Sequence, residues 1–140
     1  MKKTIVLLLS NLVFSGCAGR KNSVGSSLKI EYKAYSRGFY QMIRVENQTV
    51  FITKSREAKP EVMTLSMNDW DGLQSMVQEM DLSSLPNWKA PTNKRLFDGE
   101  ASANLRITKK GKTAESPSFD HGYPPEIIEK IVNKMLSFVK

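Results

Sequence analysis

Apolar and polar side chains alternate along several short stretches of the chain, the first of which begins at residue 28. In residues 28–35 an apolar side chain falls on every second position, and lysine and glutamate alternate between them. A period of two is typical of a strand with one face in a core and the other in water. The same pattern predicts strands at residues 39–45, 49–54 and 61–65, the last being a short strand or an edge, with a turn at residues 46–48.

Two other stretches have the period of a helix. Ser66 is a predicted N-cap, and Asp69 stands where the acid of a capping box is expected, so a helix is predicted over residues 67–80. A second helix is predicted over residues 126–139, after Pro125, which suits a first helical turn. Each helix has one apolar stripe, and both stripes require a partner surface.

The stretch between the two helices completes the order of elements. In chain order it is predicted as a helix end at 81–88, a loop at 89–100, a strand at 101–107, a turn at 109–112, a return strand at 113–116 and a rigid loop at 117–125. The order βββ(β)αββα predicts a single α+β domain, in which two helices pack on one face of an antiparallel sheet and bury every stripe. Loops as long as 89–100 are often functional.

The first 17 residues have the three parts of an export signal. Two lysines precede an apolar run of eleven residues, and a serine and a glycine then precede Cys17, the only cysteine of the chain. The run is shorter than the roughly 20 residues that a membrane-spanning helix needs. Ser15-Gly16-Cys17 resembles the lipobox of bacterial lipoproteins, which implies cleavage before Cys17 and acylation of that residue. A plain secretory signal with a chance cysteine is the alternative.

The lipobox resemblance divides the chain into three parts. They are a signal peptide at 1–16, the lipidated Cys17 with a Gly/Ser-rich tether at 17–27, and the domain at 28–140. Several acyl chains on Cys17 would make a membrane the first partner of the protein. Ala18 is not the aspartate that typically retains lipoproteins at an inner membrane, so the expected location is the outer membrane, facing the periplasm. The chain also looks like small lipoproteins of Bacteroidota whose roles are not assigned.

Charge and composition exclude several kinds of function. The chain holds 21 basic and 14 acidic residues, and removal of Lys2 and Lys3 with the signal leaves a net charge of +5. The basic residues are dispersed and form no nucleic-acid motif, so we expect no nucleic-acid partner. With one histidine and no spare cysteine, the usual zinc sites are not expected either, and no calcium loop or cofactor motif is present.

One group of residues is a candidate for catalysis. Asp98 and Asp120 each follow a phenylalanine and stand near a glycine, and His121 is next to the second of them. If the two loops meet, a carboxylate could orient His121 as a general base. No nucleophile or oxyanion donor accompanies them. In the alternative, Phe97 and Phe119 pack at the edge of the core and the aspartates bond loop amides.

Three further residues are candidates for binding. Arg37 lies between Tyr35 and Phe39, and arginine among aromatic side chains is typical of protein interfaces. Trp88 follows Pro-Asn in the segment after the first helix and is either core or an exposed anchor, whereas Arg95 lies in the long loop. These residues are compatible with a domain that recognises another protein.

The layout of the domain is similar to that of emfourin-type proteins, small bacterial inhibitors of thermolysin-like metalloproteases. The similar features are the break Ser36-Arg37-Gly38-Phe39, the segment 81–86, the strand led by Asp98 with Leu105 and Ile107, and Pro124-Pro125 before an aliphatic helix. They cover most of residues 28–138. The resemblance implies an α+β fold and a protease as a possible partner, and it transfers no inhibitory residue.

The sequence therefore leads to three hypotheses about function. The first is a lipid-anchored, non-catalytic binding domain that engages an unknown envelope protein, with a protease as one candidate. The second is an envelope enzyme or small-ligand binder that uses Asp98, Asp120 and His121. The third is a structural lipoprotein, in which Cys17 is essential and the domain can be exchanged.

Overall fold

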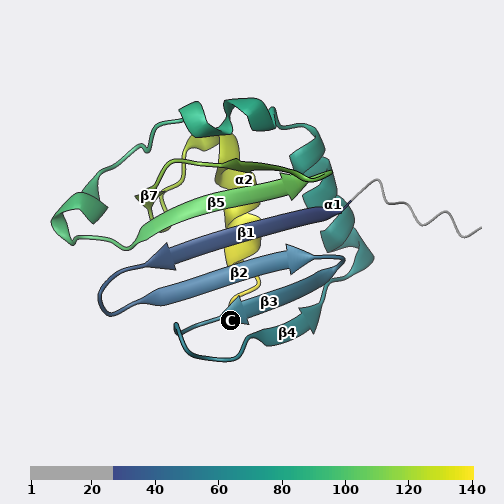
Figure 1. The fold of residues 1–140 in the computed structure, drawn as a ribbon, viewed down its shortest axis with the longest axis horizontal. Helices are drawn as coiled ribbons and strands as arrows, with labels where there is room; N and C mark the ends of the chain where they lie inside the picture. The colour runs from purple at the N-terminus through teal and green to yellow at the C-terminus, as the bar shows by residue number, and fades with distance from the viewer. Residues whose placement is uncertain (1–26) are drawn as a thin grey trace, which may run out of the picture.

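The first strand of the domain lies near the middle of one antiparallel sheet (Figure 1). The computed structural model describes residues 27–140, and the predicted signal peptide, Cys17 and most of the tether lie outside the described residues. The strands are β1 (Leu28–Tyr35), β2 (Tyr40–Glu46), β3 (Thr49–Thr53), β4 (Glu61–Thr64), β5 (Ser102–Lys109), β6 (Lys112–Glu115) and β7 (Phe119–Asp120). They are ordered β4-β3-β2-β1-β5-β6, and β7 pairs with β5.

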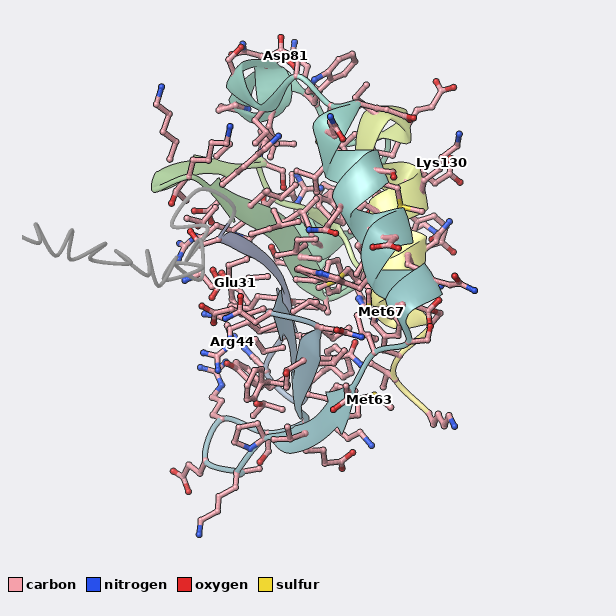
Figure 2. The ribbon with its side chains drawn as sticks, turned by 90° about the vertical axis from the view of Figure 1, so that its right-hand side faces the viewer. Glu31, Arg44, Met63, Met67, Asp81 and Lys130 are labelled. Atoms are coloured by element: carbon pink, nitrogen blue, oxygen red, sulfur yellow. The ribbon has the colours of Figure 1, made fainter. Side chains whose placement is uncertain are left out.

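Two α-helices cover one face of this sheet and leave the other face open (Figures 1 and 2). α1 spans Met67–Gln78 and α2 spans Glu126–Leu136. The helices run antiparallel, since Lys134 near the end of α2 forms an ion pair with Asp69 in the first turn of α1. The predicted α+β class, with both helices on one face, is confirmed. No helix within residues 27–140 is long and apolar enough to span a membrane.

The core lies between the helices and the sheet. The alternating apolar residues of β1, β2, β3 and β5 point to this side, where they meet the stripes of α1 and α2. The largest fully buried side chains include Tyr32, Phe119, Ile43, Leu73 and Ile128. All members of this core lie between Leu28 and Phe138, so a protein that starts at residue 18 retains all of them.

The open face of the sheet carries a row of alternating charges. The strand register places Glu31 of β1 between Arg44 of β2 and Arg106 of β5, and Arg106 is in turn opposite Glu115 of β6. Figure 2 shows Glu31 and Arg44 on the side of the sheet away from the helices. Opposite charges on neighbouring strands stabilise a sheet modestly and keep its open face soluble. The charged residues of this row therefore have a structural role in the sheet.

The structure departs from the sequence prediction mainly in the connections. α1 and α2 end at Gln78 and Leu136, earlier than predicted. Two short 3₁₀ helices, η1 (Leu82–Asn87) and η2 (Lys94–Phe97), occupy stretches predicted as a helix end and a loop. The predicted rigid loop at 117–125 contains β7. Contacts with distant residues, described below, hold these segments.

Candidate interaction site

Three segments that are far apart in sequence meet at one end of the sheet, on the left in Figure 1. They are the turn between β1 and β2, the η2 segment with the residues before β5, and the residues after β7. A shallow cleft of about 580 Å³ lies between them. It is lined by Ser36, Arg37, Phe39, Asp98, Gly99, Glu100, Ala101 and His121. The structure therefore brings together Arg37, Asp98 and His121 of the predicted site residues.

Asp120 lies beside this cleft but is buried. The side chain is fully inaccessible, and it accepts hydrogen bonds from the Thr92 hydroxyl at 2.5 Å and from the backbone N–H groups of Lys94 and Arg95 at 2.8 and 2.9 Å. The Arg95 guanidinium adds an ion pair at 3.2 Å. Thr92 lies just before η2, and Lys94 and Arg95 are its first two residues. One buried carboxylate thus fixes the backbone of that segment.

The hydrogen bonds keep Asp120 ionised. Burial by itself would raise the pKa of this carboxyl, but the bonds from Thr92, Arg95 and Lys94 outweigh burial and lower the pKa to about 2. A carboxylate that accepts several N–H and O–H bonds is stabilised in its charged form. Asp120 is therefore a structural anion with no free position for a substrate or for His121.

His121 is held by a different residue. Its Nδ1 lies 2.7 Å from the hydroxyl of Tyr32, and its ring packs against the ring of Phe39 at 5.1 Å between centroids. Because burial keeps the Tyr32 hydroxyl protonated, we assign its proton to the bond with Nδ1. Burial raises the pKa of Tyr32 and lowers the pKa of His121, and Glu100 offsets only part of the latter effect.

These contacts leave little support for a catalytic imidazole. Within the described residues, no hydrogen bond joins His121 to Asp98 or Asp120. Asp98 is exposed and ends η2 in the left-handed conformation, with φ of 57°, where aspartate is tolerated. Among residues 27–140, no group of three or more His, Cys, Asp or Glu side chains is placed to hold a metal ion.

The most unusual feature of this end of the molecule is its exposed apolar surface. Leu96 and Phe97, here called the apex, are 67% and 85% exposed. Phe39 is also exposed and lines the cleft, and the ring of exposed Tyr123 lies 4.9 Å from Lys94 Nζ of η2. Exposed apolar side chains that gather in one place mark interaction sites, whereas isolated ones do not.

The apex corrects one prediction from the sequence. Of the two phenylalanines expected at the edge of the core, Phe119 is fully buried but Phe97 points into solvent. The backbone around Phe97 is fixed by Asp120 on one side and by the bond from Gly99 N–H to the Lys94 carbonyl at 2.9 Å on the other. Phe97 therefore cannot turn inward without breaking these bonds. In the sequence, the only feature that could have indicated this exposed pair was its position between charged residues.

The side chains of the other predicted binding residues do not contribute to the exposed apolar surface of the apex. Arg95 has a side chain that is only 12% exposed, and it bonds Asp120, the Thr92 carbonyl and the Ser118 hydroxyl. Trp88 is 40% exposed and lies after η1, beside the helices. Cys17 lies outside the described residues. Arg37 alone of the three binding candidates is at the cleft.

Comparisons of the chain with protein-family models, with curated proteins and with solved structures gave no match.

Proposed function

We propose that the protein is a non-catalytic binding domain of the cell envelope, anchored through Cys17, that inserts its apex into an apolar pocket on another protein. The observation that carries this proposal is the rigid presentation of Leu96 and Phe97 by the buried Asp120. A side chain already held in its bound conformation loses little entropy on binding, so such anchors contribute strongly to affinity.

The position of the apex relative to the predicted anchor supports the proposal. β1 enters the sheet at Leu28, next to the tether, and runs toward the turn beside the cleft (Figure 1). Its eight residues span about 26 Å at about 3.3 Å per residue. An anchor at one end of β1 would therefore leave the opposite end free for a partner.

The charges beside the apex favour a protein over a lipid surface. Exposed Asp98 directly follows Phe97, and Glu100 lines the same cleft. Arg37 lines the cleft with them, so charged groups of both signs lie beside the apex. An anionic lipid surface would repel the carboxylates, whereas a protein pocket can pair charges of both signs. A protease cleft with an apolar subsite is one pocket of this kind.

The test is a comparison between two variants of the protein comprising residues 18–140. Phe97→Asp places a charge at the apex, and because Phe97 is exposed we expect the free energy of unfolding to change by less than about 0.5 kcal/mol. Val62→Asp, at another exposed apolar position, is the matched control. Each protein is cross-linked to envelope extract, and captured proteins are identified by mass spectrometry and then purified for affinity measurement.

The expected result is a partner that binds the wild type and Val62→Asp at least about tenfold more tightly than it binds Phe97→Asp. If that partner is a protease, inhibition assays with the three proteins should follow the same order. Equal affinity of the wild type and Phe97→Asp for every captured protein would contradict the proposal. Binding of the wild type to anionic vesicles, lost in Phe97→Asp, would instead assign the apex to a membrane.

A further inference from the structure

A second apolar surface lies between α1 and α2, and Lys130, one of its residues, points away from the sheet (Figure 2). It is a groove of about 470 Å³ between the end of α1 and the beginning of α2. It is lined by Met76, Glu79, Met80, Trp88, Glu126, Ile127, Glu129, Lys130 and Ile131. It shares no residue with the cleft beside the apex, so it is a separate feature of the molecule.

The floor of the groove is apolar and regular. Ile127 and Ile131 are four residues apart on α2, so they lie on one face of that helix, one turn apart. Met76 lies on α1, and Met80 follows two residues after that helix ends at Gln78. Trp88 lines the groove too, and its Nε1 donates a hydrogen bond to Ser84 Oγ at 3.1 Å, which fixes the ring. Methionine adapts its shape to different apolar partners.

The rim of the groove is acidic on a chain that is otherwise basic. Glu79, Glu126 and Glu129 face one cation, Lys130, which gives the groove a net charge of −2. Residues 27–140 as a whole hold 17 basic and 14 acidic residues, a net charge of +3. None of the three glutamates takes part in an ion pair within the described part of the chain. The rim therefore has negative charge available for a cationic partner.

We infer that this groove binds a cationic amphipathic helix of a partner protein. Apolar side chains at spacings of three and four residues would contact the methionines and isoleucines, and lysine or arginine at the edges would meet the glutamates. The described helices of a second copy do not fit this chemistry, because α1 is acidic and α2 has no net charge. The carboxylate rim would likewise repel an anionic lipid surface.

The probe is a designed leucine/lysine peptide of about 14 residues, long enough to form an amphipathic helix. It is titrated into the protein comprising residues 18–140, and its Kd is measured by fluorescence anisotropy. Methyl signals in nuclear magnetic resonance spectra locate the binding site. We expect the shifts to concentrate on Met76, Met80, Ile127 and Ile131. A leucine/glutamate peptide of the same pattern should bind at least about tenfold more weakly.

Glu79→Lys is the decisive variant. It reverses one rim charge at the C-terminal end of α1, where a cation interacts favourably with the helix dipole, so the fold should not suffer. We expect the lysine peptide to bind this variant about three- to tenfold more weakly than the wild type. Glu57→Lys makes the same charge change in the exposed loop between β3 and β4 and should leave the Kd unchanged.

Three results would overturn the proposal. One is equal Kd values for Glu79→Lys and Glu57→Lys, and another is a set of shifts that lies outside the groove. The third concerns the chain's own basic residues Arg20 and Lys21. If a protein starting at Ser27 bound the peptide more than about tenfold more tightly than one starting at residue 18, the groove would belong to the chain's own segment before β1.

Discussion

At the scale of single residues, Asp120 has the largest structural role of the polar side chains described above. It is buried, charged and bonded to three residues of the segment that carries the apex. The removal of one member of a buried charged network leaves the others without partners, which costs much more than the loss of a surface ion pair. The conformation of the apex therefore depends on a side chain that does not belong to it.

We expect Asp120→Asn to lower the free energy of unfolding by about 3 kcal/mol, because the amide N–H₂ would replace one of the two acceptor oxygens and face the N–H donor of either Lys94 or Arg95. Urea denaturation at neutral pH measures this change. Asp98→Asn is the matched control, since Asp98 is exposed and asparagine tolerates its positive φ. If Asp120→Asn lowers the free energy of unfolding by less than about 1 kcal/mol, residues 92–95 are held mainly by contacts other than those of Asp120.

Asp120 also determines part of the stability that the protein loses at acid pH. The pKa of Asp120 is about 2 in the folded protein and 3.8 ordinarily, so its contribution is complete above pH 3.8 and is lost as the pH falls through about 2. We expect the difference in unfolding free energy between the wild type and Asp120→Asn to shrink over that range. A difference that stays constant from pH 5 to about pH 2 would contradict this assignment.

His121 should titrate below the ordinary histidine pKa of 6.5, because burial disfavours the imidazolium. The protonated form is then less favourable in the folded state, so His121 supports stability above pH 6.5 and that contribution is lost as the pH falls through the folded pKa. As it is the only histidine, its ring protons give one resolved titration. Tyr32→Phe removes the donor to Nδ1 and should raise the measured pKa, whereas an unchanged value would argue against that hydrogen bond.

At the scale of elements, the hairpin turns show how the strands are joined. β5 and β6 are connected by Lys110 and Gly111, with φ of 51° and 76°, and β2 and β3 by Asn47 and Gln48, with φ of 49° and 63°. Positive φ at both central positions is typical of a type I′ turn, which matches the twist of an antiparallel pair. Gln48 pairs with Leu65 through its side chain and its carbonyl, and these bonds hold it in an unfavourable conformation.

Lys110→Asn should stabilise the protein by about 0.5 to 1 kcal/mol, because asparagine adopts the left-handed conformation more readily than lysine and Asn-Gly is the preferred type I′ pair. Thermal denaturation measures the change. Lys112→Asn removes the same charge from a strand position and serves as the control. If both variants shift the melting temperature equally, the effect arises from charge and the turn has no part in it.

The same elements show which features the sequence predicts and which it does not. The two helices and the strands β1, β2, β3 and β5 each bury one face, and this burial leaves a period in the chain that can be recognised locally. The η2 segment has no such period, because its conformation is fixed by Asp120, which is 25 to 28 residues away. For the same reason the sequence placed Phe97 at the core and missed the apex, although it selected Arg37 and His121, which line the adjoining cleft.

At the scale of the whole molecule, the apex, the acidic groove and the start of β1 lie on separate parts of the surface. The apex lies at the end of the sheet where β1 turns into β2, the acidic groove lies between α1 and α2, and the tether enters at the start of β1. If the proposed anchor and the two proposed binding surfaces exist, this arrangement would let the domain meet two partners without overlap, and the anchor could be removed without changing either surface.

Cys17→Ser should release the full-length protein from membranes and abolish fatty-acid labelling, while the folded domain remains unchanged. Labelled palmitate and membrane fractionation of cells that express each form measure the two effects. Since all core residues lie from Leu28 onward, the melting temperature of the domain should not move. A variant that remains membrane-bound with lipid attached would contradict the lipoprotein prediction.

The central place of β1 has a mechanical consequence. The apex precedes β5 and residue 17 precedes β1, so a partner held at the apex and a lipid held at residue 17 would pull β5 and β1 in opposite directions along their length. β1 is paired to β2 on one side and to β5 on the other, and the hydrogen bonds of these ladders run across the direction of pull. Such a load would fall on the ladder between β1 and β5, whose bonds would have to fail together and could not open one by one. With the proposed anchor and partner in place, the domain would therefore resist tension between them.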